Sequence, residues 1–374
     1  MISSKFWKNK KVLITGNTGF KGSWLSLWLI QMGAKVTGIG LPPNTTPSLF
    51  EKLDLSSKIE NCFFNDIRDQ LKLRQIICKT EPDVVFHLAA QPLVRDSYND
   101  PLGTWSTNLI GSLNILDSLS EINKRCSLIM ITTDKVYKNK EWGYGYREND
   151  ELGGHDPYSA SKAACEIAIE SWRASFCNSN KSFYSSNLAI ATARSGNVIG
   201  GGDWSKDRIL PDVIRALKDR KKILVRNPNS TRPWQHVLEP LCGYLILAEK
   251  LYKSQECSDF RKINELSTSF NFGPNLESNR SVSEIVEEIL NYWPGEWEIY
   301  DDKMNLHEAK LLYLNIDRAY NFLNWEPKWD FNISVRNTIN WYKKFYHDET
   351  SALSLCIRDL EDFINHKNVQ IINN

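Results

Sequence analysis

The 374-residue sequence has no strong excess of charge, no long apolar run and no paired cysteine motif. Its 46 basic and 45 acidic residues leave a formal net charge of +1, which argues against a dedicated binder of nucleic acid or acidic membranes. The longest apolar stretch, residues 24–34, is shorter than the about 20 residues that a membrane-spanning helix needs. We therefore expect a soluble protein with a small-molecule partner, no nucleic acid and no membrane.

Cysteine and histidine are also sparsely placed. The eight cysteines form no Cys-x-x-Cys pair, and the six histidines show no metal-ligand spacing, which predicts free thiols and no metal site. Residues 1–11 are basic and polar and lack an apolar stretch followed by a cleavage site, so no export signal is expected. Together these features predict a reducing, cytoplasmic location.

The first half of the chain alternates short runs rich in Val, Ile and Leu with amphipathic stretches of helical length. This alternation is typical of βαβ units and predicts an α/β fold with a Rossmann-type, doubly wound parallel sheet. The expected strands are residues 11–15, 35–38, 84–88, 128–132, 189–194 and, further on, 262–267. The expected helices are residues 21–32, 69–79, 101–119, 157–176, 238–252, 282–293, 317–323 and 333–346.

The composition of the sequence changes after the strand expected to end at residue 194, because glycine, tryptophan and proline cluster there. We expect residues 1–194 to form a dinucleotide-binding domain, joined by return segments at 234–268. Residues 195–233 and 269–348 are expected to form a smaller, mostly helical substrate domain. Residues 349–374 form a C-terminal tail that can hold one more helix.

A glycine-rich turn, residues 16–22, joins the first expected strand to the first expected helix. Glycines at this spacing allow a tight turn, close approach of the backbone to a pyrophosphate and close packing of helix on strand. An ordinary turn with incidental glycines is the alternative. We assign to dinucleotide binding Gly16, Thr18, Gly19, Phe20 and Gly22.

The end of the second strand lacks the acidic residue that many dinucleotide sites use for the adenosine ribose, because residues 38–43 read Gly-Ile-Gly-Leu-Pro-Pro. The choice between NAD and NADP is therefore open from these residues. Asp66 and Ile67 come after the third strand, next to Arg68, and we assign them to the adenine end of the cofactor. A solvated Asp66–Arg68 surface pair is the alternative.

Tyr158 and Lys162 are the first candidates for chemistry. Pro157 predicts a helix start, which places the two side chains one turn apart on the same helix face. A cationic lysine, reinforced by the positive ring of an oxidised nicotinamide, is expected to lower the pKa of the phenol and make Tyr158 a usable base. An exposed helix with no catalytic role is the alternative.

Thr133, Asp134 and Lys135 follow a strand whose carboxyl end is expected to face the ligand. The Thr133 hydroxyl can share a substrate proton. A carboxylic acid at Asp134 that protonates a leaving hydroxyl, beside an amine at Lys135 that takes a carbon-bound proton, is what an elimination needs. Lys135 acts as a base only if it is uncharged, and otherwise it stabilises an enolate. A structural Asp–Lys ion pair is the alternative.

These segments, together with residues 87–91 (His-Leu-Ala-Ala-Gln), resemble extended short-chain dehydrogenases/reductases that act on nucleotide sugars. More closely, residues 154–162, 193–204 and 232–240 are similar to the CDP-glucose 4,6-dehydratase family. The resemblance implies NAD as the cofactor, and it adds to the cofactor-binding residues Leu88, Ala89, Ala90, Tyr158 and Lys162. It implies CDP-glucose as the substrate, with its diphosphate held by Asn197, Arg208 and Arg232.

The resemblance also implies an internal redox cycle: oxidation at sugar carbon 4, loss of water across carbons 5 and 6, and return of the hydride to carbon 6. Relatives of this kind pair two long helices, here residues 101–119 and 157–176, so a homodimer or a dimer of dimers is expected. Their products usually lead to dideoxyhexoses of surface polysaccharide such as the O-antigen of lipopolysaccharide. The alternatives are the same chemistry on a UDP- or dTDP-linked sugar, and a non-catalytic dinucleotide-binding sensor.

Overall fold

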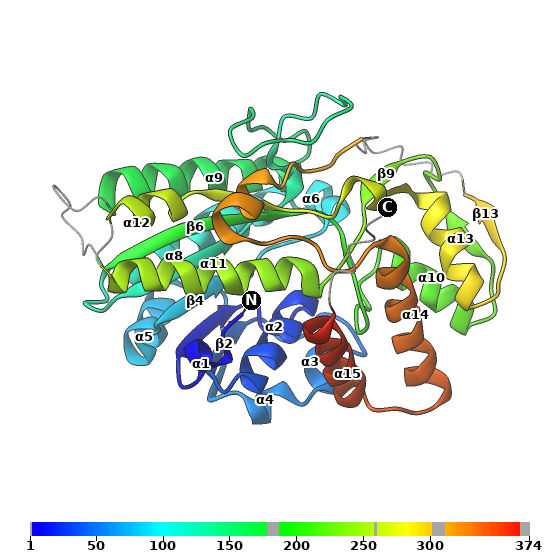
Figure 1. Cartoon of the computed structure of the whole chain (residues 1–374), viewed down its shortest axis with the longest axis horizontal. Coiled ribbons are helices and arrows are strands. Elements are labelled where there is room, and N and C mark those ends of the chain that lie inside the picture. The colour runs from blue at the N-terminus through cyan, green and yellow to red at the C-terminus, as the bar shows by residue number, and fades with distance from the viewer. Residues whose placement is uncertain (1, 178–186, 258–259, 301–310, 367–374) are drawn as a thin grey trace, which may run out of the picture.

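The computed structural model describes residues 2–177, 187–257, 260–300 and 311–366. Its centre is a seven-stranded parallel sheet in the order β11-β6-β5-β4-β1-β2-β3 (Figure 1). The strands of this sheet are β1 (Lys11–Thr15), β2 (Lys35–Gly40), β3 (Asn61–Phe64), β4 (Val84–His87), β5 (Cys126–Ile131), β6 (Leu188–Ser195) and β11 (Ser269–Phe272). The order reverses between β1 and β4, as in Rossmann-type folds, so the expected fold class is confirmed.

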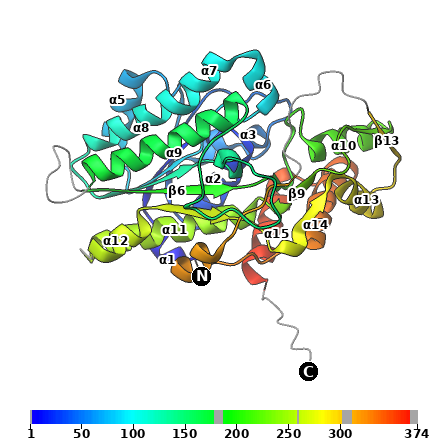
Figure 2. The ribbon, with the colours of Figure 1, turned by 90° about the horizontal axis from the view of Figure 1, so that it is seen from above.

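Helices cover both faces of this sheet (Figure 2). On one face lie α5 (Gln70–Thr80), α8 (Gly111–Ser120) and α9 (Pro157–Phe176). On the other lie α2 (Phe20–Gln31) and α11 (Leu238–Glu256). Along β1, Val12 and Ile14 pack toward α2 and α11, whereas Leu13 packs toward the opposite face. Both faces are therefore buried, as the continuous apolar runs of the strands predict.

The helix expected at residues 101–119 has three parts, α7 (Pro101–Trp105), a π-helical turn (Ser106–Ile110) and α8. The π turn places Asn108 in the interior, where its Nδ2 donates to Ser161 Oγ of α9 at 2.9 Å. The Asn108 Oδ1 accepts a hydrogen bond from the backbone N–H of Gln91 at 2.8 Å. A π turn thus ties the loop after β4 to the helix that carries Tyr158.

The remaining elements are short or lie beyond β6. Near the sheet are α1 (Ser4–Trp7), α3 (Leu49–Lys52), α4 (Leu55–Lys58), α6 (Val94–Asn99), a 3-10 turn (Asp134–Val136) and α12 (Phe260–Leu266). The second part of the molecule holds β7 (Val198–Ile199), α10 (Ile209–Lys218), β8 (Ile223–Val225), β9 (Thr231–Pro233), β10 (Gln235–His236), a 3-10 turn (Leu276–Ser278), β12 (Asn279–Ser281), α13 (Val282–Tyr292), β13 (Trp297–Ile299) and α14 (Phe331–His347). A π turn (Ala319–Leu323) instead packs against α11 and β11 of the central sheet region. The helices expected at residues 282–293 and 333–346 are confirmed as α13 and α14.

The strand expected at residues 262–267 is wrong, because the structure has α12 there and the strand, β11, begins at Ser269. Ile263 and Leu266 are three residues apart with polar residues between them, which is helical spacing. Phe270 and Phe272 alternate instead, and both are fully buried. β11 pairs with β6, so the chain returns to the central sheet through a segment that the sequence assigned to the substrate domain.

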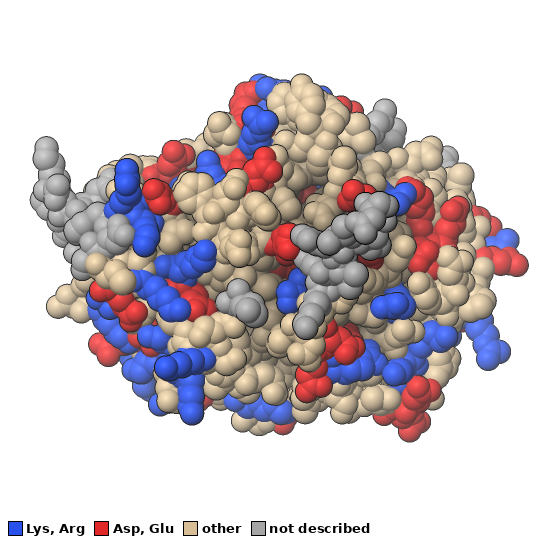
Figure 3. Space-filling model, viewed as in Figure 1, with Lys and Arg blue, Asp and Glu red and all other residues tan. Residues whose placement is uncertain are grey.

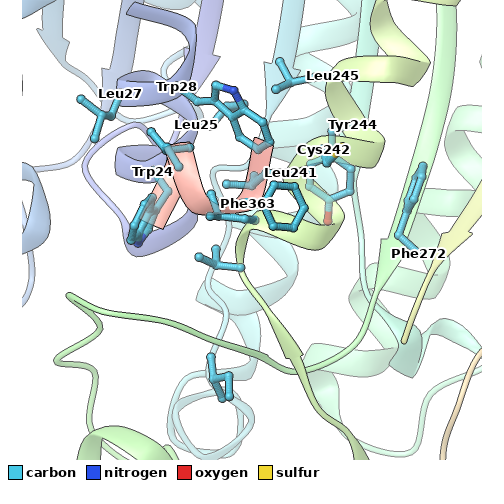
Figure 4. Packing of buried hydrophobic residues seen from close by; sticks show 14 of the residues in the cluster. Trp24, Leu25, Leu27, Trp28, Leu241, Cys242, Tyr244, Leu245, Phe272 and Phe363 are labelled. Carbon is cyan, nitrogen blue, oxygen red and sulfur yellow. The ribbon is translucent and has the colours of Figure 1, made fainter. Parts of the chain in front are cut away.

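The C-terminal tail holds the expected helix, α15 (Ala352–Asn365). Phe363 of this helix packs edge-on against Trp28 of α2, with 5.8 Å between ring centroids (Figure 4). It also packs edge-on against Trp329, with 5.2 Å between centroids. Phe363 is almost completely buried by these contacts. The tail therefore completes the apolar core beside α2.

The surface carries mixed charge. On the face seen in Figure 3, basic and acidic side chains are interspersed over the described part of the chain. All eight cysteines are free, and Cys78 and Cys257 are exposed rather than buried in core elements. Across the described ranges, no helix combines the length and the apolar character that a membrane span requires. Within those same ranges, no group of three or more His, Cys, Asp and Glu side chains is placed to hold a metal ion.

Candidate active site

The candidate site lies where the parallel strands end. β1 leads into the glycine-rich turn, β4 into residues 88–90, β5 into residues 132–135 and β6 into residues 196–197. Because β1 and β4 are neighbours in the sheet, these loops meet at the point where the strand order reverses. Open α/β sheets bind their ligands at this point.

The glycine-rich turn is packed too closely for any larger residue at two of its positions. Gly16 has a φ of +74°, and a Cβ at Gly22 would lie only 2.1 Å from the Gly16 carbonyl oxygen. α2 begins directly afterwards with Gly19 as its N-cap, and no side chain in the described residues caps its first N–H groups. A tight turn that opens a helix with free N–H groups fits the pyrophosphate of a dinucleotide.

The space at the end of β2 is taken up by the turn itself. A Cβ at Gly38 would lie 2.3 Å from Asn17 Nδ2, and a Cβ at Gly40 would lie 3.0 Å from Thr18 Oγ1. Thr18 Oγ1 donates to the Leu41 carbonyl at 2.8 Å. Where other dinucleotide sites have an acidic side chain, this chain therefore places an amide and a hydroxyl from the glycine-rich turn.

Asp66 and Ile67 have structural partners within this chain. Asp66 forms an ion pair with Arg68 at 2.6 Å, and the hydrogen bonds from Arg68 lower the pKa of the Asp66 carboxyl. Ile67 is buried against α8, because a Cβ at Gly111 would lie 2.5 Å from its Cδ1. The Asp66–Arg68 surface pair that the sequence left as an alternative is thus present, and contact of Asp66 and Ile67 with a cofactor stays a prediction.

The loop after β4 is held by a buried histidine. His87 Nδ1 lies 2.7 Å from Thr15 Oγ1, and His87 Nε2 lies 2.9 Å from Ser112 Oγ. Thr15 Oγ1 in turn accepts a hydrogen bond from the Ala89 N–H at 3.2 Å. Burial lowers the pKa of His87 to about 3, so the imidazole is neutral at physiological pH. His87 thus fixes the Leu88–Ala90 segment.

Thr133, Asp134 and Tyr158 lie together at the end of β5. Thr133 Oγ1 donates to Asp134 Oδ1 at 3.0 Å and also caps the following 3-10 turn. The same hydroxyl lies close enough to the phenol of Tyr158 to lower the pKa of that phenol. Lys162, one helical turn further along α9, is buried and donates to the Ile131 carbonyl at 3.3 Å. The structure therefore brings together the threonine, tyrosine and lysine that the sequence singled out.

The sequence predicts a lowered pKa for Tyr158, and for the protein without the nicotinamide ring this prediction is wrong. Burial raises the pKa of Tyr158 to about 12, and the charge of Asp134 adds to this, whereas the Thr133 hydrogen bond and Arg208 lower it. The burial effect is the largest because Tyr158 is only 9% exposed, and a phenolate loses most of its hydration there. Burial likewise lowers the pKa of Lys162, which weakens the cation that was expected to favour the phenolate.

Asp134 has an oxygen without a protein partner. The residue is 1% exposed, and its Oδ2 accepts no hydrogen bond from any described residue. Gly196 leaves the space beside this oxygen, because a Cβ there would lie 2.9 Å from Oδ2. Buried carboxylate oxygens are rarely left unpaired, which makes this oxygen a candidate for contact with a ligand hydroxyl. Lys135 follows Asp134 and is partly exposed.

Three segments from the second part of the molecule converge on these groups. Arg208 pairs with Asp203 at 3.1 Å, and its charge influences the pKa of Tyr158. Asn197 follows Gly196, which packs between Asp134 and Pro233. Arg232 precedes Pro233 on β9, and its Nη1 donates to the Thr231 carbonyl at 2.9 Å. The structure thus brings Arg208 near the catalytic group and places Asn197 and Arg232 in neighbouring segments.

Lys21 is a residue of this site that the sequence interpretation missed. Its Nζ donates to Ser195 Oγ at 2.8 Å, and Ser195 Oγ lies 2.7 Å from the hydroxyl of the buried Tyr244. Burial and the charge of Arg208 lower the pKa of Lys21 to about 7, and Asp134 opposes this. The position of Lys21 inside the glycine-rich turn could have indicated that it belongs to the site. The direction in which its side chain points, however, depends on contacts with β6 and α11.

The sheet order, the glycine-rich turn after β1 and the tyrosine–lysine pair on the helix after β5 define an extended short-chain dehydrogenase/reductase. The model of the GDP-mannose 4,6 dehydratase family matches residues 13–338. The chain belongs to this family.

The chain is also similar to individual named dehydratases. The chain is 42% identical to the CDP-glucose 4,6-dehydratase of Salmonella typhimurium over 97% of this chain and 99% of that protein. It is 23% identical to the dTDP-glucose 4,6-dehydratase of Haemophilus influenzae over 88% of this chain and 97% of that protein.

Solved structures share the fold. The dTDP-glucose 4,6-dehydratase of Bacillus anthracis in complex with NAD matches with a TM-score of 0.71 at 21% identity, over 90% of this chain and 97% of that one. The UDP-glucose 4-epimerase of Thermotoga maritima with UDP-glucose matches with a TM-score of 0.74 at 20% identity, over 89% and 99%.

Proposed function

We propose that this protein is an NAD-dependent hydro-lyase, a CDP-glucose 4,6-dehydratase, that converts CDP-D-glucose to CDP-4-dehydro-6-deoxy-D-glucose and water. The observation that carries the proposal is the 42% identity to a CDP-glucose 4,6-dehydratase over 97% of this chain. The geometry supports it, because the buried acid Asp134 and the amine Lys135 stand next to the Thr133–Tyr158 pair. Oxidation alone needs no such acid and base.

The residues at the strand ends fit NAD. Its pyrophosphate would be held by the turn of Gly16, Thr18, Gly19, Phe20 and Gly22, where the absence of a Cβ at Gly22 keeps the backbone open. Its remaining contacts would come from Asp66, Ile67, Leu88, Ala89, Ala90, Tyr158 and Lys162. Bound NAD would supply the acceptor, and later the donor, of a hydride. The substrate diphosphate would be held by Asn197, Arg208 and Arg232, since guanidinium groups grip phosphate through two hydrogen bonds.

In the first half of the reaction, Tyr158 takes the proton of the hydroxyl on sugar carbon 4. The Thr133 hydroxyl, which lies beside the phenol and lowers its pKa, orients that proton. Because burial raises the pKa of Tyr158 to about 12, a phenolate needs positive charge nearby, and Arg208 supplies part of it. The protein thus supplies the base and its orientation for the oxidation.

In the second half, Lys135 takes the proton of carbon 5 or stabilises the enolate that its loss creates, and Asp134 protonates the departing hydroxyl of carbon 6. The unpartnered Oδ2 of Asp134 is the atom placed for this proton transfer. The residue against that oxygen is Gly196, and a Cβ there would come within 2.9 Å of it. The acid and the base are adjacent in the chain, which suits a loss of water across adjacent carbons.

The test is the turnover of three nucleotide sugars. Purified protein with NAD is incubated with CDP-, UDP- or dTDP-glucose, and the 4-keto-6-deoxy product is measured by its ultraviolet absorbance in base. We expect turnover with CDP-glucose and no net formation of NADH. Faster turnover of UDP- or dTDP-glucose would overturn the assigned substrate. NAD binding without any turnover would favour a dinucleotide-binding sensor.

Gly22→Ala is expected to weaken NAD binding by at least about a hundredfold, because the new Cβ would overlap the Gly16 carbonyl 2.1 Å away and push the turn out of shape. Calorimetric titration with NAD measures the effect. Gly143→Ala is the control, since a Cβ there meets nothing within 4 Å. An unchanged affinity in a folded Gly22→Ala protein would contradict the assignment of the pyrophosphate to this turn.

The wider setting follows from the same proposal. We infer a cytoplasmic enzyme whose product enters the synthesis of dideoxyhexoses for surface polysaccharide. A homodimer or dimer of dimers through α7–α8 and α9 is supported by exposed apolar side chains on those helices, Leu102, Ile110 and Ile167. We also propose that residues 1–194 with the return segment up to Phe272 form the NAD domain. Residues 195–233 and 273–348 would then hold the nucleotide sugar.

A further inference from the structure

A buried ion pair lies directly behind the candidate catalytic group. Glu166 of α9 and Arg194 of β6 are joined by two hydrogen bonds, from Nε to Oε1 at 3.0 Å and from Nη2 to Oε2 at 2.9 Å. Both side chains are almost fully buried. Burial favours the neutral acid, but Arg194 and the surrounding hydroxyls outweigh it and lower the pKa of Glu166, so the carboxylate is charged.

The remaining donors to Glu166 come from three neighbouring strands of the sheet. Thr132 Oγ1 donates to Oε1 at 2.5 Å, Thr192 Oγ1 to Oε2 at 2.8 Å and Ser269 Oγ to Oε2 at 3.2 Å. The Glu166 carboxylate therefore accepts hydrogen bonds from hydroxyls at the end of β5, in β6 and in β11. A buried carboxylate with this many donors is fully satisfied and holds its surroundings in one arrangement.

The position of Glu166 along α9 connects this network to the proposed chemistry. Glu166 lies one helical turn after Lys162 and two turns after Tyr158. Its partner Thr132 directly precedes Thr133, whose hydroxyl lies beside the phenol of Tyr158 and lowers the pKa of that phenol. Glu166 thus links the helix that carries the base directly to the strand end that carries Thr133 and Asp134, as Lys162 does through the Ile131 carbonyl.

We propose that Glu166 is a positioning residue for the reaction: through Thr132 it holds the Thr133 hydroxyl against Tyr158. This inference rests on the proposed function, since it assigns Tyr158 as the base. Thr133 lowers the pKa of Tyr158 by hydrogen bonding, so a displaced Thr133 leaves a weaker acid at Tyr158. The rate rises with pH as the base loses its proton, and a higher pKa therefore moves this rise to higher pH.

In the described part of the chain, a few other charged or titratable groups also face Glu166. Those facing it are Arg194 on β6, Tyr137 bonded to Arg194, and Lys162, Cys165 and Arg173 on α9 itself. Burial lowers the pKa of Lys162, and the charge of Glu166 opposes this effect. Removing Glu166 would therefore disturb Lys162 and leave Arg194 unpaired. A sharper test removes one hydroxyl at a time.

Thr132→Val and Thr192→Val form a matched pair, because each removes one buried hydroxyl that donates to Glu166, but only Thr132 adjoins Thr133. We expect similar falls in thermal midpoint for the two variants. Thr132→Val is expected to lower kcat by about tenfold to a hundredfold, as misplacement of a reacting group does, and to shift the rising part of the pH–rate profile to higher pH. Thr192→Val is expected to leave kcat and the profile unchanged, and Thr132→Ser to restore both.

Equal effects of the two valine variants on kcat and on the pH profile, or no effect of Thr132→Val, would overturn the proposal and leave Glu166 a stabilising residue only. Crystal structures of both variants provide a readout independent of activity, with a displaced Thr133 side chain expected in Thr132→Val alone. Failure of the unmodified protein to turn over any nucleotide sugar would instead overturn the proposed function, and the crystal structures would still decide the position of Thr133.

Discussion

Tyr158→Phe is expected to lower kcat for CDP-glucose by between about a hundredfold and ten-thousandfold, the range that a positioned general base contributes. The substitution removes only the hydroxyl, whose protein partner is Thr133, and it keeps the buried ring in place. The fold should therefore survive with little change in thermal midpoint. Initial rates of product formation at saturating NAD and CDP-glucose measure the effect.

Tyr144→Phe is the matched control for this experiment. Tyr144 is an exposed tyrosine of the loop before α9, so loss of its hydroxyl should leave kcat as it is. A Tyr158→Phe protein that keeps most of its activity would show that another group takes the proton of carbon 4. Lys21, whose pKa burial and Arg208 lower to about 7, would then be the first group to examine.

Asp134→Asn is expected to lower the rate of product formation by at least about a hundredfold, while leaving the removal of the carbon 5 proton intact. An amide can hydrogen-bond to the departing hydroxyl but has no proton of suitable acidity to give it. In deuterium oxide, the variant should therefore exchange the carbon 5 proton of CDP-glucose for deuterium without forming the 6-deoxy product. Proton nuclear magnetic resonance of the recovered sugar measures this exchange.

Lys135→Met is the companion variant, and it should lose the exchange together with the product. Its side chain is partly exposed, so we expect the substitution to disturb the core less than a change at buried Asp134 does. Loss of exchange in both variants would mean that Asp134 takes part in removal of the carbon 5 proton. Normal product formation by Asp134→Asn would contradict its role as the acid.

Much of the fold was predictable because it is encoded in local pattern. The apolar runs of β1, β4, β5 and β6 and the amphipathic stretches between them specify a parallel sheet, and every expected strand of the first domain is present. The strand expected at residues 262–267 was wrong because a seven-residue helix is followed closely by a four-residue strand there, and the helical spacing rests on only two apolar residues, Ile263 and Leu266.

Some residues of the candidate site were likewise predictable from the sequence, and others were not. Thr133, Asp134, Tyr158 and Lys162 were found from spacing, because a strand end and one helical turn fix their relative positions. The roles of Lys21 and Glu166 were not visible, since their partners Ser195 and Thr132 lie 174 and 34 residues away in the chain. The direction of the Tyr158 pKa shift was missed because it depends on burial, which neighbouring residues alone do not determine.

By itself, the sequence determined the sheet, the glycine-rich turn and the candidate reacting side chains, because these depend on residues close together in the chain. Only the tertiary structure decided how burial shifts the pKa values of Tyr158 and Lys162, which oxygen of Asp134 lacks a protein partner and which buried carboxylate bonds to Thr132. These properties depend on desolvation and on hydrogen bonds between elements that meet only when the whole chain packs around one sheet.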